Sequence, residues 1–159
     1  DPALRATVQG YWTVIEPCSE PGVYVDIKPG SCPNPINVKS KGVLPVGIIG
    51  TEDLDVTQVD PATVKLEGVA PLRWALGDVG TPFEPYVGKQ DCFEDCNEEY
   101  GDGIQDLLLN FDRQEVVAAL GDVYDGDCLV LELTGNLKEE FGGNRIVGED
   151  VVIILKKGK

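Results

Sequence analysis

The residues with the clearest chemistry lie in an acidic loop, residues 95–106, which runs into the apolar stretch Leu107–Phe111. Asp95 and Asn97 stand two positions apart, so both side chains can point toward one centre. Carboxylate and amide oxygens are the ligands that calcium prefers, and this ion takes roughly six to eight of them at flexible geometry. The loop therefore predicts a calcium site that leads into a strand.

The second half of this loop matches the end of a D-x-N-x-D-G-x-x-D calcium loop. Asp102 precedes Gly103, and the glycine permits the sharp turn. Ile104 can offer its backbone carbonyl, and the Asp106 carboxylate closes the cage. Four residues separate Asn97 from Asp102, where a regular loop has a single one. The alternative is an acidic, glycine-containing surface turn without an ion.

The charge balance of the chain limits its partners. Its 159 residues include 28 acidic and 13 basic ones, which gives a net charge of −15. We expect no nucleic-acid partner, because phosphate contacts require Lys and Arg, and the same charge disfavours anionic membrane surfaces. The late apolar run Val151–Leu155 is too short to span a bilayer, so we expect no membrane insertion. The chain opens at Asp1, without Met, as a processed terminus or a truncated boundary would.

The inventory of reactive side chains argues against an enzyme. The sequence contains no histidine, which is the usual general base near neutral pH. It also lacks a G-x-S-x-G nucleophile motif and a phosphate-binding glycine loop. The densest group of carboxylates has the spacing of calcium ligands, and we assign no catalytic residue.

The cysteines predict disulfide bonds and an oxidising, extracellular compartment. They are Cys18, Cys32, Cys92, Cys96 and Cys128. Their spacing, without histidine, does not match a zinc site. The odd number leaves one thiol free or bonded to another molecule. Sequence does not fix the pairing, but a Cys32–Cys96 bridge would pin the acidic loop near the N-terminal strand. Closing this loop of ~65 residues would stabilise the fold by about 4 kcal/mol.

Short strand-like segments, separated by turn residues, occupy most of the chain. Strands are expected over residues 23–27, 42–49, 63–67, 72–76, 106–111, 127–134 and 146–157. Pro45 predicts an edge strand or a bulge, and Gly148–Asp150 predicts a bulge or turn. A helix of about two turns is expected over Arg113–Leu120, ended by Gly121. Many short strands without βαβ alternation predict an all-β fold, an antiparallel, immunoglobulin-like β-sandwich with one short helix.

Residues 1–22 form a β-rich extension to the domain at residues 23–159. Ala6–Ile15 is rich in β-branched and aromatic residues, before Pro17 and Pro21 interrupt the pattern. This segment is either a strand of its own domain or a strand that pairs with the sheet edge of a neighbouring molecule. The candidate contact residues of such an assembly strand are Val8, Tyr11, Trp12 and Val14.

Three sets of motifs together resemble a secreted domain of unknown role. They are residues 25–37 (VDIKPGSCPNPIN) with 42–46; residues 60–61 with 63–64; and residues 102–107 (DGIQDL) with 134–137 (TGNL) and 148–151 (GEDV). This domain recurs in bacterial and archaeal extracellular and cell-surface proteins, often beside calcium-binding modules, and the resemblance covers residues 23–157. It implies an extracellular β-sandwich without enzymatic activity. The compact acidic loop of the family implies ligand roles for Asp95, Asn97, Asp102 and Asp106.

Aromatic side chains support a second functional hypothesis, carbohydrate binding, because exposed rings stack on sugars. Tyr86 is a candidate for this role, whereas Trp74, within a strand pattern, is expected in the core. A second acidic turn, Asp122–Asp127, is interpreted as a strand connection rather than a second cation site. We expect an extracellular, calcium-stabilised structural protein that self-associates through its N-terminal strand as a surface or filament subunit. The alternative is a non-catalytic carbohydrate- or protein-binding module of the cell surface.

Overall fold

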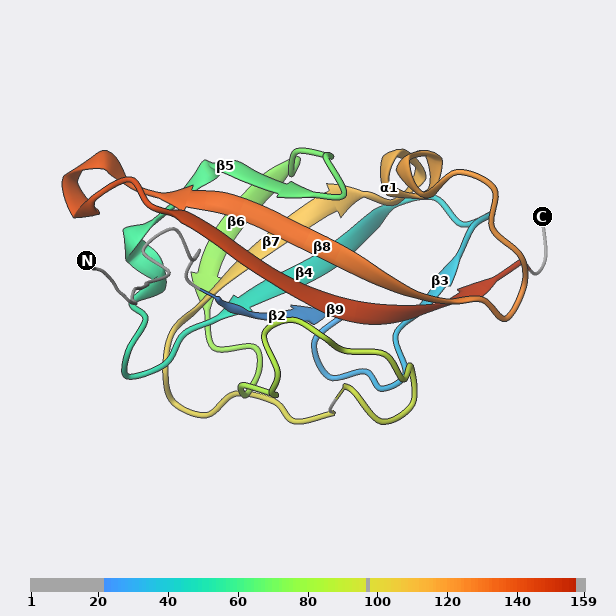
Figure 1. Cartoon of the computed structure of the whole chain (residues 1–159), viewed down its shortest axis with the longest axis horizontal. Helices are drawn as coiled ribbons and strands as arrows, with labels where there is room; N and C mark the ends of the chain where they lie inside the picture. The colour runs from blue at the N-terminus through green and yellow to red at the C-terminus, as the bar shows by residue number, and fades with distance from the viewer. Residues whose placement is uncertain (1–21, 97, 157–159) are drawn as a thin grey trace, which may run out of the picture.

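Two four-stranded sheets pack face to face in the computed structural model, which describes residues 22–96 and 98–156 (Figure 1). The first sheet has the order β2 (Tyr24–Ile27), β4 (Val43–Ile49), β7 (Asp106–Asp112) and β6 (Arg73–Gly77). The second has the order β3 (Pro35–Asn37), β9 (Arg145–Leu155), β8 (Cys128–Leu137) and β5 (Val59–Leu66). The all-β sandwich with one short helix is confirmed. The strands within both sheets pair antiparallel, apart from β3, which runs parallel to β9.

Alternating side chains explain why these segments form strands with one buried face. In β8, for example, Leu131 and Leu133 are buried while Glu132 between them is exposed. β8 and β9 pair without interruption from Cys128↔Ile153 to Asn136↔Arg145 and cross in front of β4 and β7 in Figure 1. The bulge or turn expected at residues 148–150 is therefore wrong. Gly148 serves another purpose, because a Cβ there would meet the carbonyl oxygen of Val23.

The helix α1 (Arg113–Leu120) has the predicted bounds. The Asp112 side chain caps it by accepting hydrogen bonds from the backbone N–H groups of Gln114 and Glu115. Gly121 ends it with a positive φ of 76°. Two short 3-10 helices, η2 (Val56–Gln58) and η3 (Glu139–Phe141), flank β5 and β8.

Pro45 does not mark an edge strand, because β4 lies between β2 and β7. The pairing of β2 with β4 stops at Ile27↔Val46, one position before Pro45. The carbonyl of Pro45 accepts a hydrogen bond from Lys28 on that same side. The missing N–H of the proline thus lies beyond the end of the β2 ladder, where no regular strand partner is lost.

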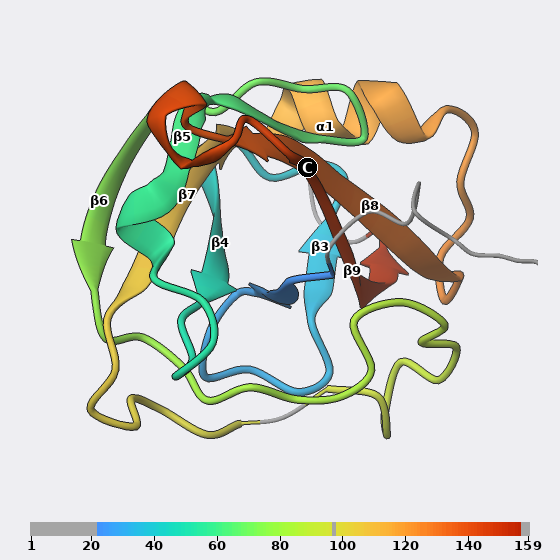
Figure 2. The same ribbon diagram turned by 60° about the vertical axis from the view of Figure 1, so that its left-hand side comes forward.

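The two lateral sides of the sandwich are built differently. On one side β2 packs beside β9, and the Val23 N–H donates to the Val147 carbonyl at 2.9 Å. The long loop 78–105 runs along this side (Figures 1 and 2). On the other side lie β6 and β5, which end their respective sheets and do not pair with each other. We call these the closed side and the open side.

Candidate functional site

Three aspartates meet where β6 ends and β7 begins. Carboxylate oxygens of Asp78, Asp102 and Asp106 lie within 4.8 Å of one another. The strand register pairs Gly77 with Asp106, which places Asp78 next to the start of β7. Asp106 is fully buried, whereas Asp78 and Asp102 are exposed.

Asp106 fastens three segments together through its carboxylate. Its Oδ1 accepts a hydrogen bond from the Gly50 N–H at 2.8 Å. Its Oδ2 accepts from the N–H groups of Val79 at 2.7 Å and Gly80 at 3.0 Å. Burial raises the pKa of Asp106, and the three N–H donors act in the opposite direction because they favour the charged form. This carboxylate therefore ties the end of β4 and the loop after β6 to the start of β7.

The two exposed carboxylates shape the last part of the acidic loop. Asp78 accepts hydrogen bonds from the N–H groups of Asp102 at 3.0 Å and Gly103 at 2.7 Å. Asp102 in turn accepts from the Ile104 N–H at 3.0 Å. Each carboxylate has about four lone-pair positions, so all three retain acceptor capacity, Asp106 the least. The donor set suits a hard cation and would supply part of a calcium shell, completed by carbonyl oxygens or water.

The structure brings together two of the predicted calcium ligands, Asp102 and Asp106. Asp95 is not part of the cluster. Its carboxylate accepts hydrogen bonds from the N–H groups of Gln90 at 2.7 Å and Asp91 at 2.8 Å. These donors lower the pKa of Asp95. The Ile104 N–H donates to Asp102, and a ligand role for the Ile104 carbonyl stays a prediction. Asn97 lies outside the described residues.

Sequence reasoning missed Asp78, the third member of the cluster. The signal was its position directly after the expected strand at residues 72–76. The antiparallel pairing of β6 with β7 brings it to Asp106, 28 positions later (106 − 78). The second acidic turn joins α1 to β8 rather than two strands, and the expectation that it holds no cation stays a prediction. Tyr124 N–H donates to Asp127, Lys156 N–H donates to Asp125, and no described carboxylate there belongs to the cluster of three.

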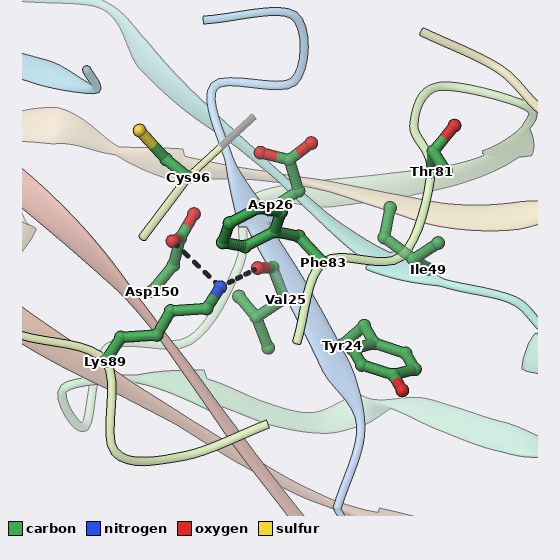
Figure 3. Close-up of a pocket in the computed structure, with 9 residues that line it drawn as sticks. All are labelled: Tyr24, Val25, Asp26, Ile49, Thr81, Phe83, Lys89, Cys96 and Asp150. Carbon is green, nitrogen blue, oxygen red and sulfur yellow. Dashed lines mark hydrogen bonds and ion pairs between the residues drawn. The ribbon is translucent and has the colours of Figure 1, made fainter. Parts of the chain in front are cut away.

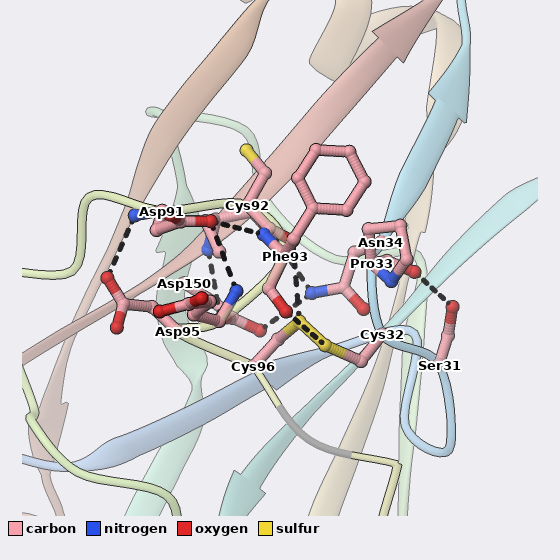
Figure 4. The surroundings of a disulfide bond; sticks show 12 residues. Ser31, Cys32, Pro33, Asn34, Asp91, Cys92, Phe93, Asp95, Cys96 and Asp150 are labelled. Atoms are coloured by element: carbon pink, nitrogen blue, oxygen red, sulfur yellow. Dashed lines mark hydrogen bonds between the residues drawn. A yellow bond between two sulfur atoms is a disulfide. The ribbon is translucent and has the colours of Figure 1, made fainter.

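Two disulfides anchor loop 78–105 to neighbouring segments, and Figure 4 shows the one between Cys32 and Cys96. Cys32 bonds to Cys96, the bridge that the sequence suggested, and Cys92 bonds to Cys128 at the start of β8. They span 64 and 36 positions. Such bridges fit an oxidising, extracellular-type environment. Cys18 lies outside the described residues.

A buried ion pair lies beneath the same loop (Figure 3). Lys89 Nζ is 3.1 Å from Asp150 Oδ1, and each side chain is 2% exposed. Asp150 Oδ2 accepts hydrogen bonds from the Ile27 N–H at 2.8 Å and the Asn34 side-chain amide at 3.2 Å. Burial raises the pKa of Asp150, while Lys89 opposes that rise. The pair joins loop 78–105, β2 and β9 through charged groups that no large substrate can reach.

Asp26 adds a second buried carboxyl to this side. It lines a small cavity of about 10 Å³ with Lys89 and Asp150, and its Oδ2 has no hydrogen-bond partner among the described residues. Burial, followed by the charge of Asp150, raises the pKa of Asp26 from 3.8 to about 8, against the opposing effect of Lys89. Asp26 is therefore largely protonated at neutral pH, which avoids a further buried charge.

The open side corrects the expectation that Trp74 belongs to the core. Trp74 is 45% and Leu76 is 49% exposed. Their partners across the strand pair, Leu109 and Leu107, are buried. Side chains directly opposite each other on paired strands project from the same face of a sheet. Trp74 and Leu76 therefore project from the core-facing side but extend past the cover that the second sheet provides.

Comparison with known proteins identifies no relative of this chain. The chain matches no protein-family model, no curated protein and no solved structure. Among the described residues, no helix is long and apolar enough to cross a membrane. Val8, Tyr11, Trp12 and Val14, the candidate assembly residues, lie outside the described residues.

Proposed function

We propose that this protein is an extracellular structural subunit, which self-assembles at a surface or into a filament through its N-terminal strand. The observation that carries this proposal is β6, a terminal strand with large apolar side chains in solvent. Leu72, just before it, and Trp74 and Leu76 within it are each about half exposed. Terminal strands present unpaired backbone groups, and exposed apolar ones are sites of strand addition.

The construction of the rest of the molecule supports a structural role. Its closed side is held by two disulfides and a buried ion pair, which suit a subunit that must keep its shape. The ionisable groups with the most unusual environments, Lys89, Asp150 and Asp26, are all buried. Perturbed groups in an active site would be expected to line an accessible cleft instead.

Deleting residues 1–17 tests the assembly role. The shortened chain should keep the β-rich circular dichroism spectrum of the full chain but sediment as a monomer, while the full chain forms larger species. The deletion retains the four cysteines that form the two bridges. Assembly that persists after the deletion would contradict a role for the N-terminal strand.

Calcium binding at the cluster of Asp78, Asp102 and Asp106 is the second part of the proposal. Close carboxylates repel one another, and a bound cation would neutralise them and hold the loop that precedes β7. An ion that binds the folded state alone stabilises it by about 2.7 kcal/mol when its free concentration is about a hundredfold above Kd.

The thermal unfolding midpoint, measured in calcium and in chelator, tests the ion site. We expect a higher midpoint in calcium for the native chain and for the control Asp122→Asn, in a turn outside the cluster. Asp102→Asn should remove most of the difference, because the amide keeps the shape of the side chain but loses its charge. Equal midpoints for the native chain in both conditions would refute the site.

A binding module of the cell surface is the second candidate. It is favoured by exposed aromatic rings, including Tyr86, which packs against Tyr24 with centroids 4.3 Å apart and ring planes tilted by 35°. Glycan binding that Tyr86→Ala removes, by a chain that stays monomeric, would support this candidate over the structural subunit.

A further inference from the structure

Two rows of side chains cross the first sheet toward the open side. One row is Val46, Leu109 and Trp74, and the other is Ile48, Leu107 and Leu76. All project from the core-facing side, because their backbone positions are directly paired. The exposed fractions along the first row are 0, 0 and 45%, and along the second they are 0, 2 and 49%. The core is therefore covered over β4 and β7 and uncovered over β6.

The core-facing side chains of β6 are exposed because the second sheet does not extend over this strand. Its last strand is β5, and a groove of about 260 Å³ separates β5 from β6. Val59 and Pro61 line the groove from the β5 side, and Trp74 and Leu76 line it from the other. Leu107 of β7 contributes to the lining between them. The sandwich thus lacks cover along one strand, and a strand added there would bury both exposed side chains.

The backbone of β6 offers the hydrogen bonds that such a strand needs. Within the described sheets β6 pairs with β7 alone. The opposite edge of the same sheet, β2, has polar partners already. Its Val25 carbonyl accepts a hydrogen bond from Lys89, and its Ile27 N–H donates to Asp150. Of these two edges, β6 is the one suited to strand addition.

We propose that the groove between β5 and β6 is the acceptor for residues 6–15 of a second copy of this chain, an inference that rests on the assembly role proposed above. The segment has a matching pattern. Val8, Trp12 and Val14 fall on one face of an extended strand, because alternate residues share a face. Gly10, on the same face, leaves room for a large ring such as that of Trp74. Residues 6–15 contain no charged side chain that burial would penalise.

The connection to the domain is long enough for the segment to reach a second copy. The described chain begins at Gly22 and is held to β9 by the bond between Val23 and Val147. Residues 16–21 include Pro17 and Pro21, which separate the β-rich pattern of residues 6–15 from β2 because proline interrupts a regular strand ladder. Six extended residues reach about 20 Å, enough to carry the strand to an adjacent subunit.

Mixing two full-chain variants tests this arrangement. The donor variant has an altered N-terminal strand and carries Trp12→Glu and Val14→Glu. The acceptor variant has an altered groove and carries Trp74→Glu and Leu76→Glu. By sedimentation velocity each variant alone should be monomeric, since a charge at the junction blocks the contact. An equal mixture should form dimers, because the unaltered N-terminal strand of the acceptor variant can bind the unaltered groove of the donor variant. The control Val130→Glu, on the exposed face of β8, should assemble like the native chain.

The other outcomes distinguish an error in the groove from an error in the assembly role. Native assembly by the acceptor variant would overturn the groove while leaving the N-terminal strand as the connector. A mixture that stays monomeric would overturn exchange between copies. A native chain that never assembles would refute the assembly role itself. Tryptophan emission gives a second readout, since the chain has 2 tryptophans, Trp12 and Trp74, one on each side of the proposed junction. We expect a shift to shorter wavelength when donor and acceptor variants are mixed.

Discussion

The closed and open sides of the sandwich treat their sheet edges in opposite ways. On the closed side, loop 78–105 covers the β2 edge, and two disulfides and a buried ion pair hold that loop in place. On the open side, the core-facing side chains of β6, Trp74 and Leu76, are exposed to solvent. One side is covered by the chain's own residues, and the other is the proposed acceptor for a strand of a second copy. The same fold can thus secure one sheet edge with its own loop and leave apolar side chains exposed at another edge.

The largest expected effect comes from breaking the ion pair on the closed side. Replacing Asp150 by Ala leaves the buried ammonium of Lys89 without its partner, and should lower the free energy of unfolding by about 3–5 kcal/mol. Denaturant titration would measure the change, with Asp122→Ala, an exposed aspartate, as the control. A loss below about 1 kcal/mol would mean that the pair contributes as little as an exposed one.

Removing the bridge between loop 78–105 and β8 should have a comparable effect. The double variant Cys92→Ala, Cys128→Ala frees a loop that spans 36 positions. The chain-entropy model gives a loss of about 4 kcal/mol for this length. Denaturant titration under oxidising conditions measures it, and an unchanged midpoint would show that the bridge does not constrain the unfolded chain.

A pair of substitutions along one row sharpens the comparison between covered and uncovered core. Leu109→Ala removes a fully buried side chain and should cost about 2–5 kcal/mol. Trp74→Ala, at the directly paired position in β6, should cost under about 1 kcal/mol in a monomeric background such as the donor variant. Equal losses would mean that the ring of Trp74 is already covered within the monomer.

The last expected effect concerns pH. The folded pKa of Asp26, about 8, lies above its ordinary value of 3.8, so the folded state retains a proton that the unfolded state releases. Stability from this group is therefore fully present below about pH 4 and is lost as the pH rises toward 8. Asp26→Asn should reduce the loss of stability between pH 5 and pH 8, by about 1–3 kcal/mol. An identical pH dependence in both proteins would contradict a buried, protonated Asp26.

The features that could be predicted from sequence are those set by neighbouring residues. The helix at Arg113–Leu120 follows from its Asp112 cap and Gly121, and alternation in segments such as β8 predicts strands. Asp102 and Asp106 stand close along the chain, so their meeting was also predictable. Asp78, by contrast, joins them through strand pairing.

The remaining features depend on which strands become neighbours. Lys89 and Asp150 lie 61 positions apart, and nothing local marks either as buried. Trp74 has the strand pattern of a core residue and projects from the core-facing side. Its exposure arises because no described strand covers it, which is a property of the second sheet rather than of β6.

Negative-stain electron microscopy of the full, oxidised chain tests most directly the claim that the open side is completed by another copy. We expect ordered filaments or sheets from the native chain, and dispersed particles from the variant Trp74→Glu, Leu76→Glu under the same conditions. Imaging in calcium and in chelator would add whether the Asp78, Asp102 and Asp106 cluster contributes. Dispersed monomers of the native chain, in calcium as well as in chelator, would contradict the account.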